Sequence, residues 1–335
     1  VGELLRDLIE SGALVERDGQ WTSDLLVEEA GIPDGVREVV GQRLRRLGAA
    51  ERVLRSAAVI GHEFRVDVLA DVVETTPDAT LDALEAAAAA QLLVEVGVDR
   101  YRFAHALVRE TLHAELSSSR RSREHRKVAL ALEARHADTI DEVVPELATH
   151  WIEASVGADR ARAIEFAIRA GELAGERGAY ESGARWFERA LAMIDESGPT
   201  SLRWSEAARR VRVQLAEAEA VSGNAVEARR HSLEAARAAI VADDPATIVA
   251  ALRVRARHSF SALDPDDPER VEVLRAALSM GSLDTWQRAA LLGELAKELI
   301  FRRDIDGRRR ALEAQDVLID QLPLVERVQL VATAG

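Results

Sequence analysis

The second half of the sequence repeats a helix–turn–helix pattern, and this period constrains the fold more than any other feature. From residue 159 onward, apolar residues recur at helical spacing between short turns. The turns centre on Gly178, Gly223, Asp264 and Asp304, which lie 45, 41 and 40 residues apart. The expected helices pair as 159–177 with 180–195, 202–221 with 225–241, 245–261 with 268–279, and 284–302 with 307–320. This pattern predicts an α-solenoid, and a non-repeating helical bundle is the alternative.

The part before residue 117 has a different order of elements. Helices are expected at about 49–60, 66–73, 76–90 and 104–116, and Thr76-Pro77-Asp78 provides a cap, a first-turn proline and an acid at one helix start. Between the last two helices, residues 92–96 and 101–103 alternate like a two-stranded hairpin. Helices followed by a hairpin are typical of a winged helix. A short strand pair is expected around Asp18-Gly19, and Ser117-Ser118-Ser119 is expected to break the chain before further helices.

Composition excludes several classes of protein. The chain has no cysteine, which removes disulfides, cysteine-ligated metals and thiol catalysis. Its formal net charge is −14, which disfavours general binding to nucleic acid or anionic membranes. We find no apolar stretch that predicts a membrane span and no secretory leader, so we expect a cytoplasmic protein without a membrane partner. Because the sequence opens and closes inside helical patterns, we expect a piece of a longer protein.

Motifs of common active sites are missing from the sequence. A phosphate-binding loop needs Gly-Lys-Ser/Thr, but the two lysines occur in Arg126-Lys127-Val128 and Ala296-Lys297-Glu298. The eight histidines show no metal-ligand spacing, so no metal site is predicted. The helix that would read DNA, residues 78–91, has three acids and no Arg or Lys. We therefore expect no catalytic residues in these segments, and DNA contact only through a domain outside the chain.

One junction is a candidate anion site. His105 follows the hairpin in Arg102-Phe103-Ala104-His105-Ala106-Leu107-Val108-Arg109-Glu110, and we place it in the first turn of the next helix. Free N–H groups and the helix dipole attract anions there. A histidine at this position can donate to a phosphate, or it can cap its own helix.

Two resemblances go beyond these patterns. The unit around Ala170-Gly171, Ala179-Tyr180 and Ala184 to Leu191 resembles a tetratricopeptide repeat. Phe103, His105, Leu107, Arg109 and Glu110 resemble the histidine motif on the winged helix of STAND-class signal-transduction ATPases. Residues 1–14 and 33–61 are similar to segments of the large LuxR-type regulators of that class.

The resemblance implies four parts and a switch. The parts are a tail of the ATPase core at 1–30, a winged helix at 31–116, linker helices at 117–157 and a tetratricopeptide-like α-solenoid at 158–335. It implies that the intact protein binds ADP or ATP in an ATPase core missing from this chain. His105 would sense the ADP phosphate and Arg109 would support it, while the repeats would bind an inducer or a partner. No cofactor is expected in this piece alone.

Arg253, Arg257 and His258 are candidate partner-binding residues, because they lie near one face of the first helix of a pair, which lines the concave side of such solenoids. A solvated face is the alternative reading of these three residues. Two other functions stay open: a helical-repeat scaffold without nucleotide coupling, and the regulatory arm of a cyclase or kinase.

Overall fold

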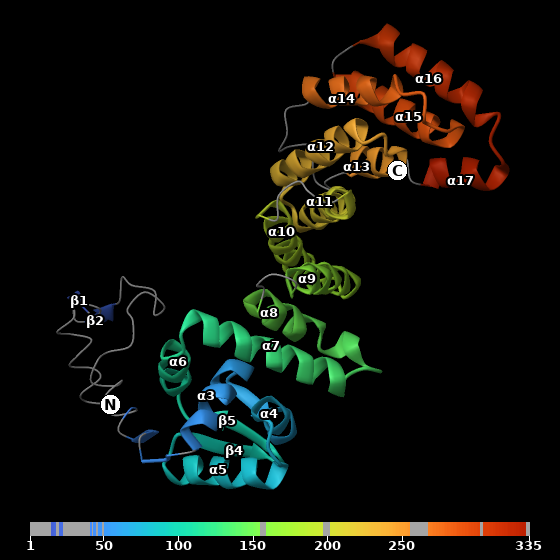
Figure 1. Cartoon of the computed structure of the whole chain (residues 1–335). Coiled ribbons are helices and arrows are strands. Elements are labelled where there is room, and N and C mark those ends of the chain that lie inside the picture. The colour runs from blue at the N-terminus through green and yellow to red at the C-terminus, as the bar shows by residue number, and fades with distance from the viewer. Residues whose placement is uncertain are drawn as a thin grey trace. The chain divides into compact units, whose positions relative to one another are not determined.

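The computed structural model describes residues 15–17, 20–22, 41, 43–44, 46–48, 50–154, 159–196, 202–254, 267–301 and 304–332. The chain divides into two compact units, Val1–Arg160 and Ala161–Gly335. Helices make up most of the described residues (Figure 1), which confirms the expectation of a mainly α chain. Among these residues no helix combines the length and the apolar character that a membrane crossing requires.

The first unit combines helices with a small sheet. Its elements are β1 (Val15–Arg17), β2 (Gln20–Thr22), α3 (Ala50–Ile60), β3 (Glu63–Arg65), α4 (Val66–Val73), α5 (Pro77–Ala89), β4 (Leu93–Gly97), β5 (Arg100–Phe103), α6 (Ala106–Ala114), α7 (Ser118–Arg135) and α8 (Val144–Ala154). The strands β1 and β2 form the expected antiparallel pair. The expected hairpin is β4–β5, and β3 adds a third antiparallel strand beside β5 in the order β3-β5-β4.

Local sequence explains most helix starts in this unit. The Thr76 hydroxyl accepts a hydrogen bond from Ala79 N at 3.3 Å, with Pro77 in the first turn of α5, as the sequence predicts. The serine run is a correction, because it starts a helix. Ser117 caps α7 by accepting from Arg120 N, and Ser118 is already helical.

The second unit is a succession of packed helices. They are α9 (Asp159–Glu176), α10 (Tyr180–Glu196), α11 (Leu202–Ser222), α12 (Ala225–Val241), α13 (Pro245–Arg253), α14 (Pro268–Leu278), α15 (Thr285–Phe301), α16 (Ile305–Ile319) and α17 (Leu324–Ala332). The turn residues Gly178 and Gly223 adopt positive φ of 74° and 90°, which glycine tolerates best. Asp304 caps α16, and Asp264 lies outside the described residues.

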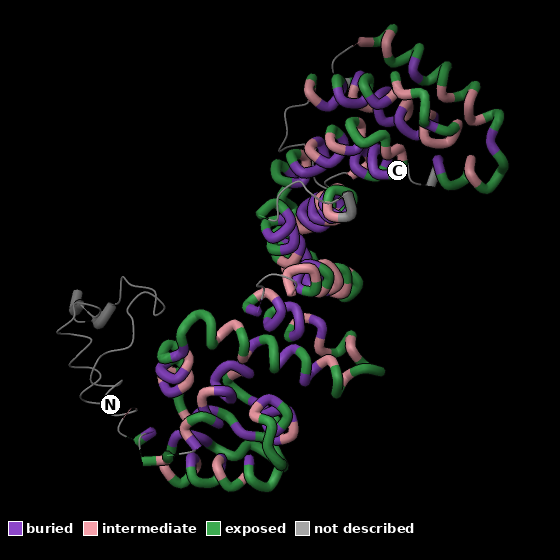
Figure 2. Tube along the Cα trace, in the orientation of Figure 1, coloured by how far each residue is buried: buried purple, intermediate pink, exposed green. Residues whose placement is uncertain are grey.

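Each core follows the apolar faces of its helices (Figure 2). In the first unit, Leu54, Leu69, Leu84 and Leu112 of the helices and Phe103 of the sheet are fully buried. In the second unit one continuous cluster runs from Val213 to Leu330, and alanines such as Ala235, Ala236 and Ala239 let neighbouring helices approach closely. This arrangement is consistent with a helical-repeat solenoid.

Candidate functional site

His105 lies at the surface, between β5 and α6. It is the N-cap of α6, with extended backbone (φ −142°, ψ 144°), and not part of the first turn as the sequence suggested. A backbone hydrogen bond from Ala104 N to Leu92 O fixes the residue before it. Its imidazole makes no capping hydrogen bond and is exposed. The side chain therefore faces outward, as a phosphate contact would require.

Arg109 makes a different contact from the one implied by the resemblance. Its Nε donates a hydrogen bond to Ala58 O, 3.0 Å away, near the carboxyl end of α3. Burial lowers the pKa of His113 and His150, and the positive charge of Arg109 lowers both further. No described hydrogen bond or ion pair joins Arg109 to His105. The Arg109 guanidinium thus connects α6 to α3 through a hydrogen bond.

Close to Arg109 lies a buried pair of histidines that was not predicted from the sequence. His125 on α7 and His150 on α8 place their Nδ1 atoms 2.9 Å apart, and both side chains are buried. Burial is the main cause that lowers the pKa of His125 to about 3 and that of His150 to about 4. Both rings are therefore neutral at pH 7, and one Nδ1 donates to the other.

A small signal for this pair was present in the sequence. His125 precedes the buried residues Val128, Ala129 and Leu132, and His150 precedes Trp151. A histidine on the apolar stripe of a helix is buried whatever its spacing to other histidines. Only the packing of α7 on α8 shows that the two rings meet.

A cavity of about 140 Å³ lies in the second unit, among α13, α15, α16 and α17. Its lining residues are Arg253, Ala290, Gly293, Glu294, Ala296, Lys297, Ile300, Arg308, Leu312, Gln315 and Leu330. The half-buried Arg253 lies over the ring of Trp286, 5.5 Å from its centroid. Lys297 pairs with Glu294 at 3.2 Å, whereas Arg253 and Arg308 have no ion pair with any described residue.

This cavity contains one of the three predicted partner-binding residues. Arg253 ends α13 and lines the cavity. Arg257 and His258 lie outside the described residues. An apolar wall with two arginines that have no carboxylate partner among the described residues is suited to a ligand with an acidic group.

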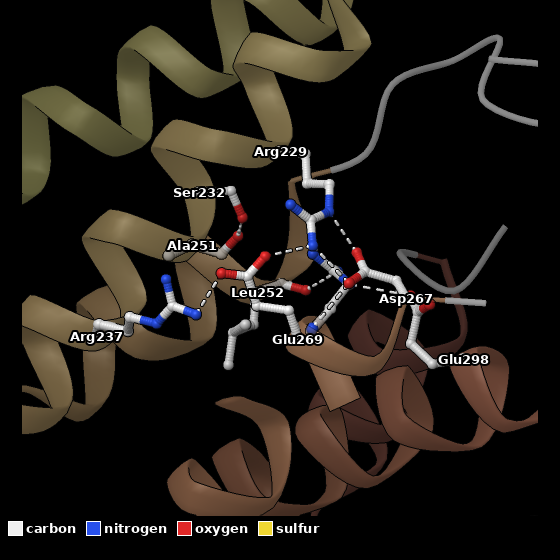
Figure 3. A network of polar contacts seen from close by, with 9 residues as sticks. Arg229, Ser232, Arg237, Ala251, Leu252, Asp267, Glu269 and Glu298 are labelled. Carbon is white, nitrogen blue, oxygen red and sulfur yellow. Dashed lines mark hydrogen bonds and ion pairs between the residues drawn. The ribbon is translucent and has the colours of Figure 1, made fainter. Parts of the chain in front are cut away.

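A polar network joins consecutive helices of the second unit (Figure 3). Arg229 of α12 forms two hydrogen bonds of 2.6 Å to Asp267 and one to Glu269 of α14. The buried Arg270 of α14 donates to Leu252 O of α13 and, at 2.9 Å, to Glu298 of α15. The network therefore joins four helices, α12 to α15.

The solved structures that are similar to this chain include two weak matches. No protein-family profile matches the chain, and no curated protein matches it. BtubC (BKLC) from P. vanneervenii aligns with 60% of this chain and 80% of its own, at 13% identity and a TM-score of 0.41. PH0952 from Pyrococcus horikoshii, a Signal Transduction ATPase with Numerous Domains (STAND) protein with a tetratricopeptide repeat sensor, aligns with 90% of this chain and 47% of its own. The identity is 11% and the TM-score 0.32. TM-scores below 0.5 do not establish a shared fold.

Proposed function

We propose that this chain is the regulatory and sensor region of a LuxR-type transcriptional regulator of the STAND class. In this proposal residues 31–116 act as a winged helix that restrains the ADP-bound state, and the repeats bind an inducer or a partner. The intact protein binds ATP and ADP through a core outside these residues. This region has no catalytic role of its own and works in the cytoplasm.

The observation that carries the proposal is the exposed His105 at the start of α6. The helix order α3, α4, α5, followed by the β4–β5 hairpin, supports the winged-helix assignment. The imidazole lacks a capping bond, so it can donate to a phosphate held by a neighbouring domain. Arg109 enters the proposal as a positioning residue, since its bond to Ala58 O orients α6.

The cavity lined by Arg253 supports the sensor part of the proposal. Its two arginines without described carboxylate partners attract an acidic group, and its apolar residues accept the rest of a small ligand or side chain. Binding at this place would alter how α13, α15, α16 and α17 pack. The repeats would thereby report on the ligand to the rest of the protein.

The test replaces His105 in the full-length protein. We expect His105→Ala to copurify with less ADP and to show higher basal transcriptional activity, because one phosphate donor is lost. His136→Ala is the matched control, since this partly exposed histidine caps the far end of α7 and contacts Thr139. Unchanged ADP occupancy and basal activity in His105→Ala would contradict the proposal.

A partner-binding scaffold without nucleotide coupling is the second candidate, and the cavity favours it independently of His105. This function predicts that Arg253→Ala weakens partner binding while ADP has no effect on it. The first proposal predicts that ADP and the partner alter each other's affinity. Titrating the partner with and without ADP separates the two.

A further inference from the structure

Two carboxylates and one imidazole converge at the turn between α11 and α12. Glu219 comes from the last turn of α11, and Glu227 and His231 come from α12. Candidate ligand atoms of these three side chains all lie within 4.8 Å of one another. None of them takes part in the proposed nucleotide or inducer sites.

The helix hairpin explains why these residues meet. Glu227 and His231 are four residues apart, so they lie on the same face of α12, one turn from each other. The turn at Gly223 brings the end of α11 back against α12, which puts Glu219 opposite them. The His231 Nε2 atom is 3.7 Å from Glu219 Oε1 and 4.0 Å from Glu227 Oε2.

Glu219 is unusual because its carboxylate is buried without a matching donor. The residue is 4% exposed, and its Oε2 has no hydrogen-bond partner among the residues that the structure describes. A buried carboxyl of this kind is costly to a fold unless a cation or a donor compensates it.

His231 offers one ring nitrogen to the cluster and the other to a supporting carboxylate. Its side chain is 10% exposed, and within the described part of the chain its Nδ1 has no hydrogen-bond partner. Glu234 Oε2 lies 3.7 Å from that Nδ1, from the next turn of α12. A metal-bound histidine commonly donates its second N–H to such a carboxylate.

Arg230 is the competing cation. Its guanidinium donates to Glu227 Oε2 at 2.6 Å and contacts His231 Nε2 at 2.8 Å. It also reaches Glu234 at 3.1 Å, and its side chain is 49% exposed. Arg230 can therefore leave Glu227 and His231 at small cost and keep a carboxylate partner.

We propose that Glu219, Glu227 and His231 bind a divalent transition-metal ion of the zinc type. One imidazole nitrogen and two carboxylates suit such an ion better than Ca²⁺ or Mg²⁺, which prefer oxygen ligands alone. The exposed position of Glu227 leaves room for water as a fourth ligand. The ion joins α11 to α12 within one helix pair and compensates the buried carboxylate.

The test is titration of Zn²⁺ into the whole chain by calorimetry at pH 7.5, with Co²⁺ absorption as a second probe of the ligands. We expect one saturable Zn²⁺ equivalent and no comparable Ca²⁺ binding. Glu219→Gln and His231→Gln should each weaken Zn²⁺ binding by about tenfold or more. Arg230→Gln should strengthen it, because a competing cation is removed.

His136→Gln is the control for chance binding at a surface histidine and should leave the Zn²⁺ affinity unchanged. Glu219→Gln keeps the shape of the buried side chain, so it decides the matter even if His231→Gln fails to fold. No saturable Zn²⁺ binding, or equal affinity in wild type, Glu219→Gln and Arg230→Gln, would overturn the proposal.

Discussion

A methyl group added to Gly171 would lie 2.5 Å from Cε1 of Phe187, because the backbone of α9 passes directly beside that ring. Phe187 is 4% exposed. Gly183 of α10 packs less tightly, since a methyl carbon added there would lie 3.1 Å from the Gly171 carbonyl oxygen. The helices α9 and α10 thus pack closely where Gly171 meets the ring of Phe187. A close-packed contact of this kind does not accept even one extra carbon.

We expect Gly171→Ala to destabilise the protein by about 1–3 kcal/mol, since the Phe187 ring has to move. Gly175→Ala is the matched control on the same helix. Nothing lies within 4 Å of a methyl group at residue 175, so this change should stabilise α9 by up to ~1 kcal/mol. Thermal unfolding of the two variants measures the difference, and equal melting temperatures would contradict this account of the contact.

The buried histidine pair predicts that the first unit loses stability in acid. Folding lowers the pKa of His150 from 6.5 to about 4, mainly through burial, so the unfolded chain binds more protons between these values. The contribution of neutral His150 to the free energy of unfolding is therefore fully present above about pH 6.5, and it is lost as the pH drops towards 4. The lowered pKa of His150 alone corresponds to about 3 kcal/mol.

Charges on two helices act directly on this pair. Arg109 and His113 face it from α6, Arg121 from α7, and Glu153 of α8 acts on His113. Hydrogen exchange of α7 and α8, corrected for the intrinsic pH dependence, reports local stability. A His125→Leu, His150→Leu double variant should show a flatter pH dependence than wild type. The same slope in both would show that other groups are responsible.

Replacement of Arg109 tests its assignment as a positioning residue. Arg109→Ala removes the hydrogen bond to Ala58 O and should cost about 1.5–3 kcal/mol. It also removes a positive charge beside the histidine pair, so the pKa of His150 should rise and the acid sensitivity should decrease. Arg123→Ala is the control, because Arg123 is exposed on α7 and has no described ion pair. Comparable losses in the two variants would exclude a specific role for the Ala58 contact.

Periodic and local signals predicted much of the fold. The cap at Thr76, the hairpin β4–β5 and the turn glycines Gly178 and Gly223 all follow from short-range chemistry. The strand β3 was missed, because Glu63–Arg65 is three residues long and pairs with β5 only after α4 and α5 have returned the chain. A short strand forms only when it pairs with a neighbouring strand, and the local sequence does not show which strand that will be.

The candidate sites also divide into features that the local sequence predicts and features that depend on contacts between distant segments. The motif drew attention to His105, which the structure places at the exposed N-cap of α6; its role stays a prediction. The histidine pair and the Glu219 cluster depend on contacts between different helices, which helical periodicity alone does not specify. The contact of Arg109 could not be predicted for the same reason, because its partner Ala58 lies 51 residues earlier in the sequence.

Arg270 provides the sharpest test of the network in the second unit. Its side chain is 8% exposed and bonds to Leu252 O and Glu298, so Arg270→Met leaves a buried carbonyl and a largely buried carboxylate without this donor. We expect a loss of about 3–5 kcal/mol in unfolding free energy. Arg275→Met on the same helix should cost less than about 1 kcal/mol, because that side chain is 58% exposed and 3.9 Å from Asp304. An Arg270→Met, Glu298→Met double variant should recover part of the loss, since the unpaired carboxylate is removed with the arginine. Urea unfolding measures these three variants and Glu298→Met alone, and a double variant as unstable as the sum of its two single changes would show that the pair is not coupled.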